Sequence, residues 1–159
     1  MKYFVFKDQI FTVFLSLSHL TSITFPSKVL DFVGGDRGDF KVYELNKGRS
    51  LVYEPHKSSV DKNFLVFLKD QKFHYNLKSD NSFSDKDIEI KKAKPCKLFS
   101  LLKETKNFKL FECPRSLYLV NKSPRLKVNE MEIGKAKFLS KGPPLWVDGD
   151  LIYYRGELR

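Results

Sequence analysis

The chain has 159 residues, the usual size of one protein domain, and its hydrophobic content of 42% is enough for one packed core. Charged residues make up 30% of the chain, which excludes an integral membrane protein. The formal net charge of +10 and the pI of about 9.5 favour acidic partners: nucleic acid, anionic lipid, peptidoglycan or an acidic protein surface.

The first 24 residues have the layout of a secretory signal peptide. Lys2 and Lys7 form a basic head, residues 10–17 (IFTVFLSL) are an apolar run, and small residues follow it. The run is shorter than the ~20 residues that a membrane span needs. We therefore expect a signal peptide over residues 1–24 and a single periplasmic or otherwise extracytoplasmic domain over residues 25–159, with no transmembrane span after processing. The alternative is a buried strand or helix at the N-terminus.

From residue 29 onward, short runs of β-branched and aromatic residues are separated by turn residues. Residues 34–38 are predicted as a loop, and strands are expected over residues 39–45 and 51–54. Residues 64–68 (FLVFL) are apolar without a break, which is typical of a central strand covered on both faces.

Residues 72–77 (KFHYNL) show the period of two that a half-buried strand requires, because Phe73, Tyr75 and Leu77 alternate with polar residues. Two polar residues separate this run from the preceding apolar one, so the pair predicts a β-hairpin. Another alternating strand is expected at residues 88–90.

Pro95 begins a different pattern. Four apolar residues follow at positions i, i+1, i+3 and i+4, namely Leu98, Phe99, Leu101 and Leu102. This spacing predicts one short amphipathic helix near residues 96–106.

The two cysteines, Cys96 and Cys113, lie 17 positions apart. An even number of cysteines in an exported protein favours a disulfide, and the spacing does not fit a zinc site. Two separate buried thiols are the alternative.

Strands are expected again in the last third of the chain. They cover residues 108–113, 117–121, 126–129 and 135–139, followed by a hairpin of residues 145–147 and 151–154 around the turn Asp148-Gly149. About nine short strands at spacings near ten residues predict a mainly β fold: a single antiparallel β-sandwich or small barrel with one short helix.

Trp146 is the single Trp of the chain and follows Pro143-Pro144, which predicts an edge strand or a loop leading into one. Trp is favoured at binding hot spots. We expect a partner-binding surface formed by Trp146, Tyr153, Tyr154 and Arg155. The alternative is that Trp146 fills the bottom of the sandwich.

The sequence is poor in catalytic and metal-binding groups. His19, His56 and His74 lie far apart, and no nucleophile, zinc-protease or phosphate-loop motif occurs. The acidic residues at 80–87 and 148–150 do not have the EF-hand spacing. We therefore expect no enzyme, no metal site and no cofactor.

A nucleic-acid-binding β-barrel is the alternative function. Its stacking and phosphate-binding side chains would be Phe73, Tyr75, Phe108, Phe111, Lys69, Lys72, Lys91 and Lys92. Most of these aromatics alternate with polar neighbours, as core residues of strands do, and export would separate the protein from nucleic acid. Nucleic acid is therefore not the expected partner.

Residues 63–77 (NFLVFLKDQKFHYNL) resemble a stretch in the N-terminal β-domain of the TrbG/CagX conjugal-transfer family. In that family a strand beginning near an Asn is followed by a hairpin into an aromatic-x-aromatic-x-Leu strand. Residues 38–45 and 51–55 fit the preceding strands, so the resemblance spans about residues 38–92, whereas residues 93–159 do not match the second domain of the family.

Members of this family are periplasmic parts of the outer-membrane core of type IV secretion machines and assemble as rings. The resemblance therefore implies a structural component of such an envelope assembly, with protein subunits as partners and a homo-oligomeric ring as its form. It implies no catalytic residue.

Overall fold

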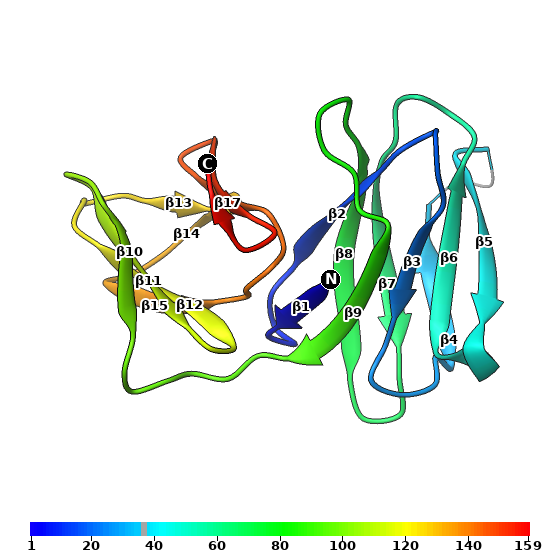
Figure 1. Cartoon of the computed structure of the whole chain (residues 1–159), viewed down its shortest axis with the longest axis horizontal. Coiled ribbons are helices and arrows are strands. Elements are labelled where there is room, and N and C mark those ends of the chain that lie inside the picture. Colours follow the sequence, from blue (N-terminus) through cyan, green and yellow to red (C-terminus); the bar gives the residue numbers. More distant parts are fainter. Residues whose placement is uncertain (36–37) are drawn as a thin grey trace. The chain divides into compact units, whose positions relative to one another are not determined.

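The computed structural model describes residues 1–35 and 38–159, so Asp36 and Arg37 of the predicted loop lie outside the described residues. In the described part, eighteen strands and one 3-10 turn (Asn46–Gly48) make up the regular structure, and no α-helix is present (Figure 1). The strands form four sheets, none of which closes into a barrel. The predicted mainly β, sandwich-like fold is confirmed.

The helix predicted near residues 96–106 is wrong. This segment contains strand β10 (Ser100–Glu104), which pairs antiparallel with β11 (Phe108–Cys113). The register shifts between Leu101 and Lys103, as a β-bulge causes. Leu98 and Phe99 precede this strand, whereas Leu101 lies opposite Phe111 and Leu102 packs against the buried core, so the helical spacing came from residues in different settings.

The chain packs as two compact units, whereas the sequence predicted one sandwich over residues 25–159. The first unit consists of Met1–Lys2 and Ile10–Lys91, and the second of Tyr3–Gln9 and Lys92–Arg159. The N-terminal segment therefore contributes residues to both units.

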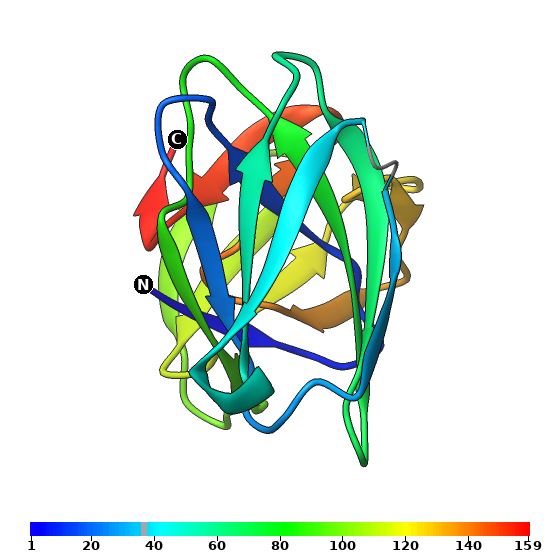
Figure 2. The same ribbon diagram turned by 90° about the vertical axis from the view of Figure 1, so that its right-hand side faces the viewer.

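The first unit has two sheets. One contains β9 (Asp87–Lys92), β3 (Thr21–Thr24), β6 (Ser50–Pro55) and β5 (Phe40–Leu45) in this order; the other has the order β2 (Phe11–Leu15), β8 (Lys72–Ser79), β7 (Asp61–Phe67) and β4 (Asp31–Gly34). Most of β1 (Lys2–Val5) belongs to the second unit. Figure 2 shows the blue strand β3 beside the blue-green and cyan strands β6 and β5. The pairs β2–β8 and β3–β9 are parallel, so these sheets are mixed and not purely antiparallel as predicted.

Aromatic side chains from both sheets fill the core of the first unit. Tyr53 on β6 and Tyr75 on β8 are completely buried, with their hydroxyl oxygens 2.5 Å apart. Phe64 on β7 packs edge-on against Tyr53, with ring centroids 5.2 Å apart. Burial raises the pKa of both tyrosines, so the hydroxyls stay neutral and link the two sheets by a hydrogen bond.

The predicted hairpin of strands β7 and β8 is confirmed, with Phe64 opposite Tyr75. Strand β8 alternates buried and accessible side chains, as its period of two predicted. Strand β7 is covered on one face, because Phe64 and Val66 are buried whereas Phe67 is 36% exposed. The prediction that this strand is covered on both faces is wrong.

Residues 1–24, expected to be a signal peptide, form strands β1, β2 and β3 of the sheets. All five residues of β2 are buried, and Ile23 of β3 is completely buried. The backbone amide of Phe14 donates a 2.8 Å hydrogen bond to the buried carboxylate of Asp85. The alternative of a buried N-terminal strand therefore describes this segment, and its apolar run belongs to the core of the first unit.

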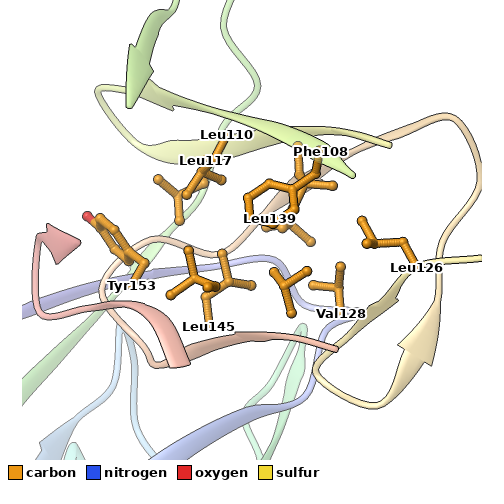
Figure 3. Close-up of a cluster of buried hydrophobic side chains, with 11 residues drawn as sticks. Phe108, Leu110, Leu117, Leu126, Val128, Leu139, Leu145 and Tyr153 are labelled. Carbon is orange, nitrogen blue, oxygen red and sulfur yellow. The ribbon is translucent and has the colours of Figure 1, made fainter. Parts of the chain in front are cut away.

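The second unit is a sandwich of two antiparallel sheets. One has the order β10, β11, β12 (Ser116–Asn121) and β15 (Ala136–Leu139); the other has the order β14 (Met131–Glu132), β13 (Lys127–Val128), β16 (Leu145–Val147), β17 (Asp150–Tyr154) and β18 (Glu157–Leu158). Leucines of the first sheet, such as Leu110 and Leu117, pack with Leu145 and Tyr153 of the second in one buried cluster (Figure 3).

The hairpin predicted at the end of the chain is also confirmed. Asp148 and Gly149 connect β16 to β17 with φ angles of 49° and 86°, the left-handed conformation that this turn requires. Arg155 and Gly156 form a second turn of the same kind, with φ angles of 55° and 86°, and lead into β18.

Candidate protein interface

The partner-binding surface predicted at the closing hairpin lies mostly inside the second unit. Tyr153 and Tyr154 are each 1% exposed, and Trp146 is half-buried. Arg155 is exposed, and its guanidinium carbon lies 5.9 Å from the ring centroid of Tyr154. Because both tyrosines are inaccessible to a partner, these four residues do not form a common surface.

The hydroxyl of Tyr153 gives a test of this core role. It is buried without a hydrogen-bond partner among the described residues, and burial raises its pKa, so it remains neutral. An unpaired buried hydroxyl destabilises a protein by ~1–3 kcal/mol. Tyr153→Phe is therefore expected to leave the free energy of unfolding unchanged or to raise it by about 1 kcal/mol in urea denaturation. A loss of stability would show that the hydroxyl has a partner.

Exposed apolar side chains gather at the start of β10 instead. Leu98 is 89% exposed, Leu101 is 52% exposed and Phe99 is 39% exposed. A single exposed apolar residue is ordinary, but three within four positions of the chain mark a candidate interaction site. We call Leu98, Phe99 and Leu101 the apolar edge.

Strand β10 is also an edge strand. It pairs with β11 on one side and lies at the end of the order β10-β11-β12-β15. The backbone groups on its other side are therefore available to a further strand. Proteins usually protect such edges with charges, prolines or bulges. Here a bulge and the charges of Lys103 and Glu104 are present, but the apolar edge remains exposed beside the open backbone.

The predicted disulfide between Cys96 and Cys113 is present, with Cα atoms 5.9 Å apart. It joins the residues just before β10 to the last residue of β11, at the open end of the hairpin. At the other end, the Oγ1 atom of Thr105 accepts hydrogen bonds of 3.1 Å from the amides of Asn107 and Phe108. Both ends of the hairpin are therefore fixed, and the edge strand is held against β11.

An aromatic row continues from the apolar edge across the outer face of the same sheet. Its members are Phe99, Phe111, Tyr118 and Phe138. The ring centroid of Tyr118 lies 4.9 Å from that of Phe99 and 4.6 Å from that of Phe138. The cross-strand register places Leu101 opposite Phe111, Phe111 opposite Tyr118 and Tyr118 opposite Phe138, so these side chains share one face.

The second unit is much more basic than the first. Lys and Arg outnumber Asp and Glu by 16 to 8 in the second unit, but by 13 to 11 in the first. Near the apolar edge, Glu104 lies 3.3 Å from both Lys109 and Lys122. Hydrogen bonds from these two ammonium groups hold the pKa of Glu104 below its usual value, so it stays ionised and paired.

The nucleic-acid interpretation loses most of its stacking residues. Phe73 is 3% exposed, Tyr75 is completely buried and Phe108 is 5% exposed, so their rings belong to the cores. Phe111 is half-buried within the aromatic row. A base cannot stack on a ring that is buried in a core, which excludes three of the four aromatics.

A second group of exposed apolar residues lies on the first unit, at and just before the edge strand β4. Leu30 is 63% exposed and Val33 is 61% exposed, and Phe67 of the neighbouring strand is 36% exposed. A disulfide and an aromatic row distinguish the apolar edge of β10 from this group. We therefore take the apolar edge as the candidate interface.

The sequence placed the residues of the apolar edge on one face of a helix and so missed the interface. A signal for the hairpin was present, because Lys106-Asn107 lies about midway between the two cysteines, with an apolar run on each side. Two apolar runs around a polar turn are typical of a hairpin.

Metal sites and membrane-spanning helices are other features that residues 1–35 and 38–159 could contain. No three His, Cys, Asp or Glu side chains in this part of the chain come together as ligands for a metal ion. Nor does this part contain a helix with the length and apolar character that crossing a membrane requires. No protein-family model matches the chain, and no curated protein matches its sequence significantly.

Proposed function

We propose that the protein is a binding module of an extracytoplasmic assembly, acts without catalysis and docks a partner protein on the apolar edge of β10. The observation that supports this proposal is an open edge strand with exposed apolar side chains on it, at Leu101, and just before it, at Leu98 and Phe99. A partner strand gains backbone hydrogen bonds at such an edge. Full burial of a large apolar side chain adds ~1.5–3 kcal/mol.

The disulfide supports the extracytoplasmic location. Disulfides persist in oxidising compartments and are rare in the cytosol. The bond between Cys96 and Cys113 closes the hairpin that carries the apolar edge. An oxidising compartment, such as the periplasm, therefore keeps the proposed docking strand in place.

The assembly that we propose is an envelope machine of the type IV secretion or conjugation kind. The segment that resembles the TrbG/CagX N-terminal β-domain, residues 38–92, forms strands β5 to β9 in the first unit. Each unit has its own core, which is compatible with a component that contacts more than one subunit. In such a machine the protein acts as a structural component of a homo-oligomeric ring.

Photo-cross-linking in the cells that naturally produce the protein tests this function. A photoreactive amino acid at position 98 is expected to give a discrete adduct with another envelope protein, identified by mass spectrometry, because Leu98 is 89% exposed beside the open strand. Position 131 is the matched control: Met131 is 48% exposed and lies on β14 of the other sheet of the same unit.

The control position is expected to give no such adduct. The double variant Leu98→Asp/Leu101→Asp should also abolish co-purification of the partner while the thermal unfolding of the isolated protein stays near that of wild type. Equal adducts from positions 98 and 131, or none from position 98, would refute the proposed interface.

A further inference from the structure

We infer that the segment docking on β10 is acidic: an extended stretch of another protein in which carboxylates alternate with apolar side chains. This inference rests on the proposed function and specifies its partner. Lys97, Lys103 and Lys106 lie next to the apolar edge in the chain, and no carboxylate of the described residues lies within 4.0 Å of their ammonium groups. These charges are available to a partner.

The carboxylates of the β10–β11 hairpin are already paired. Glu104 binds Lys109 and Lys122, and Glu112 lies 2.7 Å from Lys141. The hairpin therefore has a surplus of positive charge beside its open strand. A partner that brings carboxylates gains complementary contacts, whereas a basic partner meets like charges.

The alternation follows from the geometry of the edge. Phe99 contacts the aromatic row, and Leu101 is the cross-strand neighbour of Phe111, so both lie on the outer face of the sheet. A strand that pairs with β10 continues the pleat and directs every second side chain to this face. At these positions of the partner strand, apolar side chains would extend the aromatic row. The positions between them are then the ones that can carry the carboxylates.

A second copy of this chain is a poor occupant of the edge. Pairing two copies through β10 would bring the same three unpaired lysines of each chain together, in units where Lys and Arg outnumber Asp and Glu by 16 to 8. Like charges across an interface are destabilising. The occupant that the charges favour is therefore a different, acidic protein.

Two synthetic peptides test the inference on the full chain. One repeats Leu-Asp-Val-Glu and the other repeats Leu-Lys-Val-Lys, so they differ in charge but keep the apolar alternation. Binding is measured by fluorescence anisotropy, and the site by hydrogen exchange of backbone amides. We expect the acidic peptide to bind at least tenfold more tightly than the basic one and to protect amides within residues 98–104, with affinity falling as salt rises.

Charge-reversal variants localise the effect. Lys97→Glu/Lys103→Glu/Lys106→Glu is expected to remove or invert the preference for the acidic peptide. The matched control, Lys69→Glu/Lys78→Glu/Lys86→Glu, makes the same change in net charge at exposed positions of the first unit and is expected to keep the preference.

Three results would overturn the inference. One is equal binding of the two peptides, or none by the acidic peptide. Another is protection of amides outside the hairpin, and the third is tighter binding of oligothymidylate at the same amides, which would assign the face to nucleic acid. If position 98 still cross-links to a partner while the two peptides bind equally, the proposed function stands, but the inference that the partner segment is acidic is refuted. Absence of the adduct refutes the proposed function itself.

Discussion

A chain that begins at residue 25 is expected not to fold its first unit. The deletion removes β2, which pairs with β8, and β3, which lies between β9 and β6 in its sheet. Phe14, Leu15 and Ile23 are each at most 2% exposed. Truncating one such side chain costs ~2–5 kcal/mol, whereas a whole domain is stable by only ~5–15 kcal/mol. Amide NMR spectra and thermal unfolding of residues 25–159 measure the outcome.

A short C-terminal deletion is the matched control. Removing residues 157–159 takes away β18, a two-residue strand with exposed side chains, and is expected to leave the signals of the first unit unchanged. If residues 25–159 keep the dispersed amide signals and the melting transition of the first unit, strands β2 and β3 are dispensable. The signal-peptide interpretation would then be preferred over a structural role of this segment.

The N-terminal segment shows how one pattern fits two structures. Residues 10–17 are apolar and short, which is typical of a signal peptide but also of a strand buried on both faces. Strand β2 is such a strand, since all its residues are buried and it pairs in parallel with β8. Its partner strand in the sheet, with Tyr75 beside Phe11, lies about 60 positions away, so local sequence cannot distinguish the two.

Structural features that depend on a few neighbouring residues were predictable from the sequence. The alternation in β8 and the Asp148-Gly149 turn were both correct, because the period of two and the left-handed turn conformation are properties of a short segment. The pairing of Cys96 with Cys113 was also correct. Each of these features is determined within fewer than 20 residues of the chain.

The division into two units was not predictable from such signals. The backbone of Phe4 forms a bridge with Lys141, and the side-chain amide Nε2 of Gln9 donates a hydrogen bond to the carbonyl oxygen of Phe138. These contacts join segments about 130 residues apart, and residues 3–9 pack in the second unit. Nothing in the local pattern of either segment indicates the other.

The candidate site was missed for a related reason. Trp146, Tyr153, Tyr154 and Arg155 were expected to form a partner surface because they are near one another in the closing hairpin, but closeness in the chain does not show which side chains face the core. Both tyrosines are buried because β17 lies between β16 and β18, and the guanidinium groups of Arg155 and Arg159 lie within 6 Å of the Tyr154 ring. The apolar edge was missed because its residues have the spacing of a helix in the sequence, although Leu98 and Phe99 precede β10 and only Leu101 lies within it.

Loss of the disulfide is expected to destabilise the second unit by about 3 kcal/mol. The bond between Cys96 and Cys113 closes a loop of 17 positions, and without it the unfolded chain gains the conformational freedom of that loop. Urea denaturation of Cys96→Ser/Cys113→Ser, followed by the amide signals of the second unit, measures the change. Reduced wild-type protein is expected to behave in the same way, which separates loss of the bond from the effect of the serines.

The first unit is the internal control, because it contains no cysteine and its amides are expected to exchange at the same rates in both forms. Within the second unit, the amides of β10 are expected to lose most protection, since the bond holds this edge strand to β11 at the open end of the hairpin. Loosening β10 should also lower the yield of the cross-linked adduct from position 98. Docking would then depend on the disulfide, and so on an oxidising compartment. Identical urea midpoints for the oxidised and reduced proteins would contradict this role, because the hairpin would then be held by its strand pairing and the Thr105 turn alone.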